Sequence, residues 1–122
     1  MAQNTVNPDV NLISEAATIK LGATIKPGAT LHQLMSNQPS ALTQLLTMIQ
    51  PNDGVLLVAD GCYRIKEVSA LDKDNSVYAL KADIDMRGLT AHSSANTKVM
   101  CITDDEWVAL TLAYARTASW IV

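Results

Sequence analysis

The chain has 122 residues, 48% hydrophobic and 17% charged, with a formal net charge of −3 and a pI near 5.1. This length and composition predict one globular domain with a real core, and the acidic balance argues against direct binding of nucleic acid, which favours a basic face. Cys62 and Cys101 form no C-x-x-C pair and the two histidines lack ligand spacing, so we expect no metal site and no cofactor.

The sequence also bears on where the protein works. Its first residues, MAQNTVNPDVNL, lack the basic start and apolar run of a secretory signal. No apolar stretch reaches the roughly 18 residues that would span a membrane. Two isolated cysteines fit a reducing compartment. We therefore expect a cytoplasmic protein with no membrane association.

Residues 1–29 differ from the rest of the chain and form a separate amino-terminal extension. They hold no aromatic residue, and the hexapeptide IKLGAT (19–24) is followed at once by IKPGAT (25–30). Two copies are too few for a solenoid, although each glycine can mark a turn. Two interpretations stay open, a short hairpin and a loosely held tail.

From Thr30 onward, strand and helix patterns alternate. A short strand is expected over 30–35 and a buried strand over 55–59, where VLLVA is continuously apolar as in parallel sheets. Between them, a leucine and isoleucine stripe at helical spacing predicts a helix that ends in the turn 51–54. The stripe consists of Leu42, Leu45, Leu46 and Ile49.

The second half of the chain repeats this alternation. A short helix is expected over 62–73, a central strand over 76–80, a helix over 82–88 that Gly88 terminates, and a strand over 98–102. Thr103 and Glu106 then have the spacing of a capping box at the start of a last helix. The order β-α-β-α-β-α-β-α predicts a three-layer α/β/α domain over 30–122 with a mostly parallel sheet.

Five segments from Leu31 onward resemble the DsrH/TusB family, whose fold is DsrEFH-like. They are LHQL (31–34), VLLVADG (55–61), VYALKADIDMRGL (77–89), DDEWVALT (104–111) and Trp120. Each is weak alone, but together they occur in order, with similar spacing, over about 90 residues of the chain.

The resemblance implies a role in a sulfur relay. In this family three related subunits, of the DsrE/TusD, DsrF/TusC and DsrH/TusB types, form a cytoplasmic heterohexamer. The Tus branch passes persulfide sulfur towards 2-thiolation of wobble uridine in tRNA, and the Dsr branch serves sulfur oxidation. The principal sulfur-carrying cysteine lies on the DsrE/TusD subunit, so the subunit that this chain resembles is mainly architectural.

The chain departs from the family at three places. Residues 1–29 precede the Leu-His with which members usually begin. The first helix has no cysteine, since Leu45 stands roughly where Dsr-branch members place theirs. Cys62 matches no family cysteine. The missing helix cysteine favours the Tus branch.

Cys62 is the candidate catalytic thiol of the sequence. A carrier thiol must be exposed and partly ionised, which a helix amino end or a cation promotes. Asp60 would oppose ionisation, while Arg64 and Lys66 are near in sequence. The alternative, which we favour, is that Cys62 packs as a small hydrophobic residue.

The other candidate residues have mainly structural interpretations. We expect Cys101 in the core, His32 on a strand bonded to a neighbouring loop, and His92 in an exposed loop. Arg87 can stabilise the end of its helix or reach a partner subunit. Trp107 and Trp120 are core residues in a monomer and interface residues in an obligate oligomer.

Three functional hypotheses follow. The first is a non-catalytic subunit of a TusBCD/DsrEFH-like relay, with Trp107, Trp120 and Arg87 at interfaces and a homo-oligomer when the chain is isolated. The second is a sulfur carrier that uses Cys62. The third is a stand-alone α/β domain that binds a small ligand in a pocket beyond Asp60.

Overall fold

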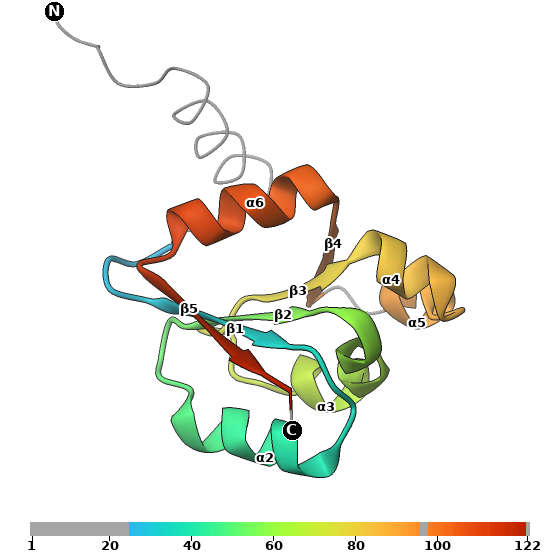
Figure 1. The fold of residues 1–122 in the computed structure, drawn as a ribbon, viewed down its shortest axis with the longest axis horizontal. Helices are drawn as coiled ribbons and strands as arrows, with labels where there is room; N and C mark the ends of the chain where they lie inside the picture. The colour runs from blue at the N-terminus through green and yellow to red at the C-terminus, as the bar shows by residue number, and fades with distance from the viewer. Residues whose placement is uncertain (1–24, 96–97, 122) are drawn as a thin grey trace, which may run out of the picture.

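The computed structural model describes residues 25–95 and 98–121 (Figure 1). The expected extension over 1–29 lies mostly outside these residues. The elements are β1 (Thr30–Leu34), α2 (Pro39–Met48), β2 (Gly54–Leu57), the 3-10 helix η1 (Ala59–Arg64), α3 (Ile65–Ser69), β3 (Val77–Leu80), α4 (Lys81–Met86), α5 (Thr90–Ala95), β4 (Val99–Ile102), α6 (Asp104–Ala113) and β5 (Arg116–Trp120).

The five strands form one parallel sheet in the order β4-β3-β2-β1-β5. The chain steps from β1 to β4 in one direction and then returns past β1 to place β5 at the far edge. Helices α2 and α3 lie on one side of the sheet and α6 lies on the other (Figure 1). The predicted three-layer α/β/α fold with β2 and β3 as inner parallel strands is confirmed.

Side-chain alternation divides the core into two layers. One layer packs Leu57 and Ala79 of the sheet beneath α2 and α3, with Cys62 among them. The other packs Leu56 and Tyr78 against α6. Strands β2 and β3 are buried on both faces, which explains their continuously apolar sequences.

The capping box at the start of α6 is present as predicted. The Thr103 hydroxyl accepts a bond from the Glu106 amide at 3.3 Å, and the Glu106 carboxylate accepts one from the Thr103 amide at 2.8 Å. These two bonds satisfy backbone donors that the helix itself leaves without partners.

Replacing Thr103 with alanine should therefore lower the free energy of unfolding by about 1 kcal/mol. Urea denaturation followed by circular dichroism measures this change. Ser69→Ala is the matched control, because the Ser69 hydroxyl bonds the Lys66 carbonyl of its own helix, α3, at 2.8 Å. The control should be neutral or slightly stabilising, since alanine is the better helix former. Equal losses for both variants would contradict the assignment.

Two elements are missing from the sequence prediction. Residues 90–95, expected as a loop, form α5, so His92 lies on an exposed helix. The end of the chain, which had no predicted structure, forms β5 and pairs with β1 along its length. The single helix expected over 62–73 is instead η1 followed by the shorter α3.

The amino-terminal turn of the described chain agrees with its Pro-Gly sequence. Gly28 has a φ of +83°, and the Ala29 amide bonds the Lys26 carbonyl at 3.1 Å. Ile25 packs beside the α6 layer of the core.

Within residues 25–95 and 98–121, no helix is both long and apolar enough to cross a membrane.

Candidate functional site

The turn that follows β2 is built by close backbone packing. Ala59 adopts a φ of +53°, which is rare for a residue with a side chain, and its amide donates to Asp83 at 2.7 Å. Gly61 lies directly against the Leu34 carbonyl, at the end of β1. This contact turns the chain sharply and directs Cys62 back beneath the sheet.

The Cys62 thiol is enclosed in this structure. Its residue has no exposed surface, and the thiol contacts the Leu57 carbonyl at 3.6 Å. Burial, followed by the negative charge of Asp83, raises the pKa of Cys62 from 9.0 to about 12, and Arg87 offsets only part of this rise. At neutral pH the thiol is therefore protonated and inaccessible, which matches the packing interpretation.

An ion-pair cluster lies beside the same turn. Arg87 contacts Asp60 at 3.0 Å and Asp83 at 3.6 Å, and it also bonds the Asp83 carbonyl within the last turn of α4. Asp60 therefore does more than shape a turn, since it holds Arg87 to the end of β2. The structure brings Cys62, Asp60 and Arg87 together, but Arg87 is engaged by carboxylates and does not activate the thiol.

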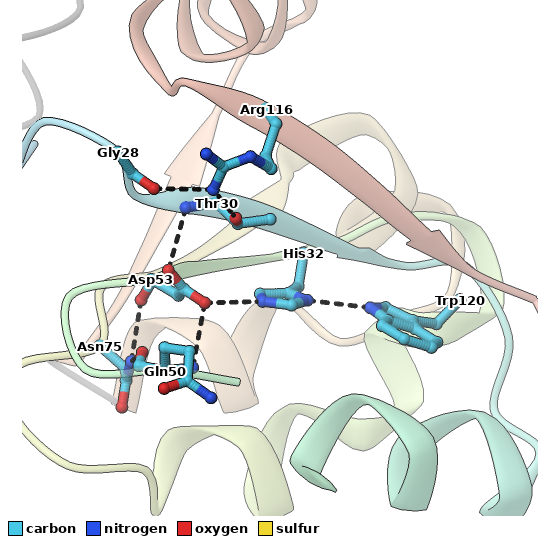
Figure 2. A network of polar contacts seen from close by, with 8 residues as sticks. All are labelled: Gly28, Thr30, His32, Gln50, Asp53, Asn75, Arg116 and Trp120. Atoms are coloured by element: carbon cyan, nitrogen blue, oxygen red, sulfur yellow. Dashed lines mark hydrogen bonds and ion pairs between the residues drawn. The ribbon is translucent and has the colours of Figure 1, made fainter. Parts of the chain in front are cut away.

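A second polar cluster joins β1 and β5 to the loops that precede β2 and β3 (Figure 2). His32 and Asp53 are 3% and 5% exposed, and the His32 Nε2 lies 2.9 Å from Asp53 Oδ2. The Trp120 indole N–H donates to His32 Nδ1 at 3.0 Å, and the two rings stack 6.0 Å apart. An indole nitrogen can only donate, so His32 Nδ1 accepts and Nε2 carries the proton given to Asp53.

Asp53 joins several elements through the same carboxylate. It accepts bonds from the amides of Thr30 and Gln50 at 2.9 and 3.0 Å as well as from His32. Asn75 completes the cluster by donating to the Gln50 and Asp53 carbonyls (Figure 2). Burial alone would raise the pKa of Asp53. The bonds donated by Thr30, His32 and Gln50 outweigh burial and hold the pKa below its ordinary value of 3.8.

We call the residues His32, Asp53, Asn75 and Trp120 the buried polar network. The sequence predicted that His32 bonds a neighbouring loop, and this is confirmed. The roles of Asp53 and Asn75 were not predicted, because a PNDG turn is common wherever a helix ends. The bonds of the buried polar network join β1 and β5 to the loops before β2 and β3, so the network holds these strands in position.

The other predicted residues lie apart from this network. Trp107 is half-buried on the α6 side, where its indole donates to Gln33 at 2.6 Å and Gln33 donates to Ser119 at 3.1 Å. Cys101 is also half-buried, with its sulfur 2.7 Å from the Ser93 hydroxyl, so its expected place in the core was wrong. Its strand, β4, is an edge strand, in which Met100 and Cys101 are partly exposed while Val99 and Ile102 are buried.

Two hollows on the described surface have volumes of about 320 and 300 Å³. The first is lined by residues 49–51, 70–72 and 74–75, and the second by Lys81, Ala82, Asp85, Thr103 and Asp104. Neither includes Asp60 or Cys62, where the ligand-binding hypothesis placed its pocket. In the part of the chain that the structure describes, no group of three or more His, Cys, Asp or Glu side chains could hold a metal ion.

Comparison with known proteins gives one consistent result. The family model described as DsrH like protein matches residues 36–117. Proteins named Protein TusB from Salmonella arizonae, Salmonella newport and Salmonella choleraesuis are each 37% identical to the chain over 81 residues. Each match covers 62% of this chain and 83% of the relative.

Proposed function

Because the chain belongs to the DsrH family, we propose that it serves as a non-catalytic subunit of a sulfur-relay complex of the TusBCD/DsrEFH type. Its partners would be DsrE/TusD-like and DsrF/TusC-like subunits, and the assembly would be a cytoplasmic heterohexamer. The identity to proteins named TusB supports transfer towards 2-thiolation of tRNA wobble uridine. In this assignment the chain itself does not bind the tRNA.

The observation that best supports a non-catalytic role is the burial of Cys62. A carrier cysteine must attack the outer sulfur of a donor persulfide as a thiolate, and the persulfide that it then holds must be within reach of the next acceptor thiolate. Cys62 has no exposed surface, and its pKa of about 12 leaves almost no thiolate at neutral pH. The sulfur that passes through the complex would therefore travel on cysteines of a partner subunit.

The chain would contribute surfaces to the complex. Trp120 of β5 and Trp107 of α6 pack on opposite sides of the sheet, and Arg87 lies at the carboxyl edge of β2 and β3. Tryptophan and arginine are enriched at protein interfaces. We assign these three residues as partner contacts of the relay complex.

Cys62→Ser should leave sulfur transfer by the assembled complex unchanged. Serine retains a hydroxyl that can donate to the Leu57 carbonyl, and no reacting thiol is lost. The measurement reconstitutes the chain with DsrE-like and DsrF-like subunits and follows transfer of radiolabelled sulfur and 2-thiolation of tRNA.

Cys101→Ser is the matched control, because it removes the other cysteine, which is half-buried. A Cys62→Ser complex that assembles normally but no longer transfers sulfur would make this chain a carrier. The position of Cys62 after a strand and near Arg87 would then be the relevant feature, and the thiol would have to open before it reacts.

A further inference from the structure

One side of the described part of the chain carries almost no charge. Residues 33–52, 107–115 and 117–122 contain no Asp, Glu, Lys or Arg, whereas most charged residues of the chain lie between 60 and 106. These three uncharged segments include α2, most of α6 and most of β5, which come together at one edge of the sheet (Figure 1). Depletion of charge is a mark of the core of a protein interface.

We call this side the charge-poor surface. It consists of the exposed residues Ser40, Thr43, Gln44, Leu46, Thr47 and Met48 of α2, Val108, Thr111 and Leu112 of α6, and Thr117, Ser119 and Ile121 at β5.

The threonine side chains of this surface are less polar than their residue type suggests, because their hydroxyls are bonded within their own helices. The Thr43 and Thr47 hydroxyls donate to carbonyls of α2 at 2.9 and 2.8 Å, and Thr111 does the same within α6. A hydroxyl bonded back to its own helix has less need of water. The helices that border β5 on both sides of the sheet can therefore be covered with little loss of hydration.

Strand β5 provides an open edge at the centre of this surface. Within the described sheet its one neighbour is β1, and the Met35 amide bonds the Trp120 carbonyl at 3.0 Å. Since backbone groups alternate along a strand, those of Thr117 and Ser119 point away from β1. Unpaired groups of this kind readily accept another strand.

Edge strands are commonly protected by charge, by proline or by their short length. The opposite edge, β4, has four residues flanked by Lys98 and Asp104. Strand β5 has five residues and begins with the exposed Arg116, but from 117 to 120 it has neither a charged residue nor a proline. The open edge is therefore on the charge-poor side.

We infer that this surface joins two copies of the chain through antiparallel pairing of their β5 strands. With a two-fold axis normal to the sheet, the sheet would extend across both copies. The α2 helix of one copy would then face α2 of the second copy, and likewise for α6. An uncharged surface complements itself under this symmetry, whereas copies that meet through their charged sides, each with a net charge of −3, face repulsion.

The pairing has a specific register. With Ala118 at the axis, Thr117 of one copy lies opposite Ser119 of the second copy, and these residues exchange their outward backbone bonds. Arg116 then lies opposite Trp120 of the second copy on the same face of the sheet. A guanidinium over an indole ring is a favourable contact. The inference concerns this chain alone and is independent of its role in a relay.

Thr117→Pro tests the pairing without removing a bond to β1. Proline is tolerated at an edge position whose amide faces outward, but it deletes two symmetric bonds between the copies. Light scattering at tens of micromolar should give the wild-type chain about twice its 13.1 kDa mass. Thr117→Pro should raise the dissociation constant at least about tenfold.

Thr111→Glu places a charge on the same surface at a helical position that glutamate suits, so it should also weaken association without unfolding the chain. Met86→Glu is the control, because Met86 is 77% exposed on α4 among the charged residues, and it should leave the mass unchanged. Circular dichroism verifies folding of each variant. A monomeric wild-type chain, or a folded Thr117→Pro variant that associates as tightly as wild type, would overturn the inference.

Discussion

Replacing Asp53 with alanine should lower the free energy of unfolding at pH 7 by about 3–5 kcal/mol, as expected when one partner of a buried charged network is removed. The carboxylate is buried and accepts bonds from Thr30, His32 and Gln50. Alanine would leave the buried His32 donor and the two partly buried amides without this acceptor. Urea denaturation at a fixed protein concentration measures the loss.

The loss should depend on pH in a defined direction. The pKa of Asp53 lies below its ordinary value of 3.8, so its charge stabilises the fold fully above that value. This stabilisation is lost as the pH falls through the lower pKa of the folded state. The difference between wild type and variant should therefore be full at pH 7 and shrink below about pH 3.8.

Asp74→Ala is the matched control for Asp53→Ala. Asp74 is exposed in the loop before β3, and its removal should change stability by less than about 0.5 kcal/mol. If Asp53→Ala were as mild as this control, or if its effect grew at acid pH, the assigned role of the carboxylate would be wrong.

Gly61→Ala should cost about 3 kcal/mol or more and reduce the yield of folded protein. A Cβ at this position would lie 1.9 Å from the Leu34 carbonyl oxygen and 2.6 Å from its carbon. Both atoms belong to the backbone, and the same oxygen already accepts a bond from the Val58 amide at 3.0 Å. No side-chain rotation relieves this overlap, so β1 and the turn must separate.

Gly28→Ala separates this steric effect from backbone strain. A Cβ at Gly28 would meet nothing within 4 Å, but its φ of +83° is unfavourable for alanine. It should cost on the order of 1 kcal/mol, clearly less than Gly61→Ala. Thermal denaturation of both variants provides the comparison, and a Gly61→Ala variant as stable as Gly28→Ala would exclude the close contact.

The contacts of Asp53 and Gly61 give a structural explanation for two segments of the family resemblance. The Leu-His at β1 and the Asp-Gly after β2 are parts of two segments that resemble the DsrH/TusB family. In the structure His32 locks Asp53 and Trp120 in place, and Gly61 allows the chain to pass Leu34. Both motifs therefore stabilise the arrangement of the strands.

The sequence alone determined the features that depend on near neighbours. The apolar runs of β2 and β3, the leucine stripe of α2 and the capping box at Thr103 each specify an element within about ten residues. Alternation of these elements then predicts a parallel sheet covered on both sides, because parallel strands need helical crossovers.

Only the tertiary structure decided the features that join distant parts of the chain. Strand β5 has a mixed, mostly exposed sequence, and its place depends on pairing with β1. The bond between Gln33 of β1 and Ser119 of β5, for example, joins residues 86 positions apart. The burial of Cys62 depends on α2, and the role of Asp53 depends on β1 and β5. Local patterns carry no record of such contacts, since the same residues would suit a loop, an exposed thiol or an ordinary turn in another packing arrangement.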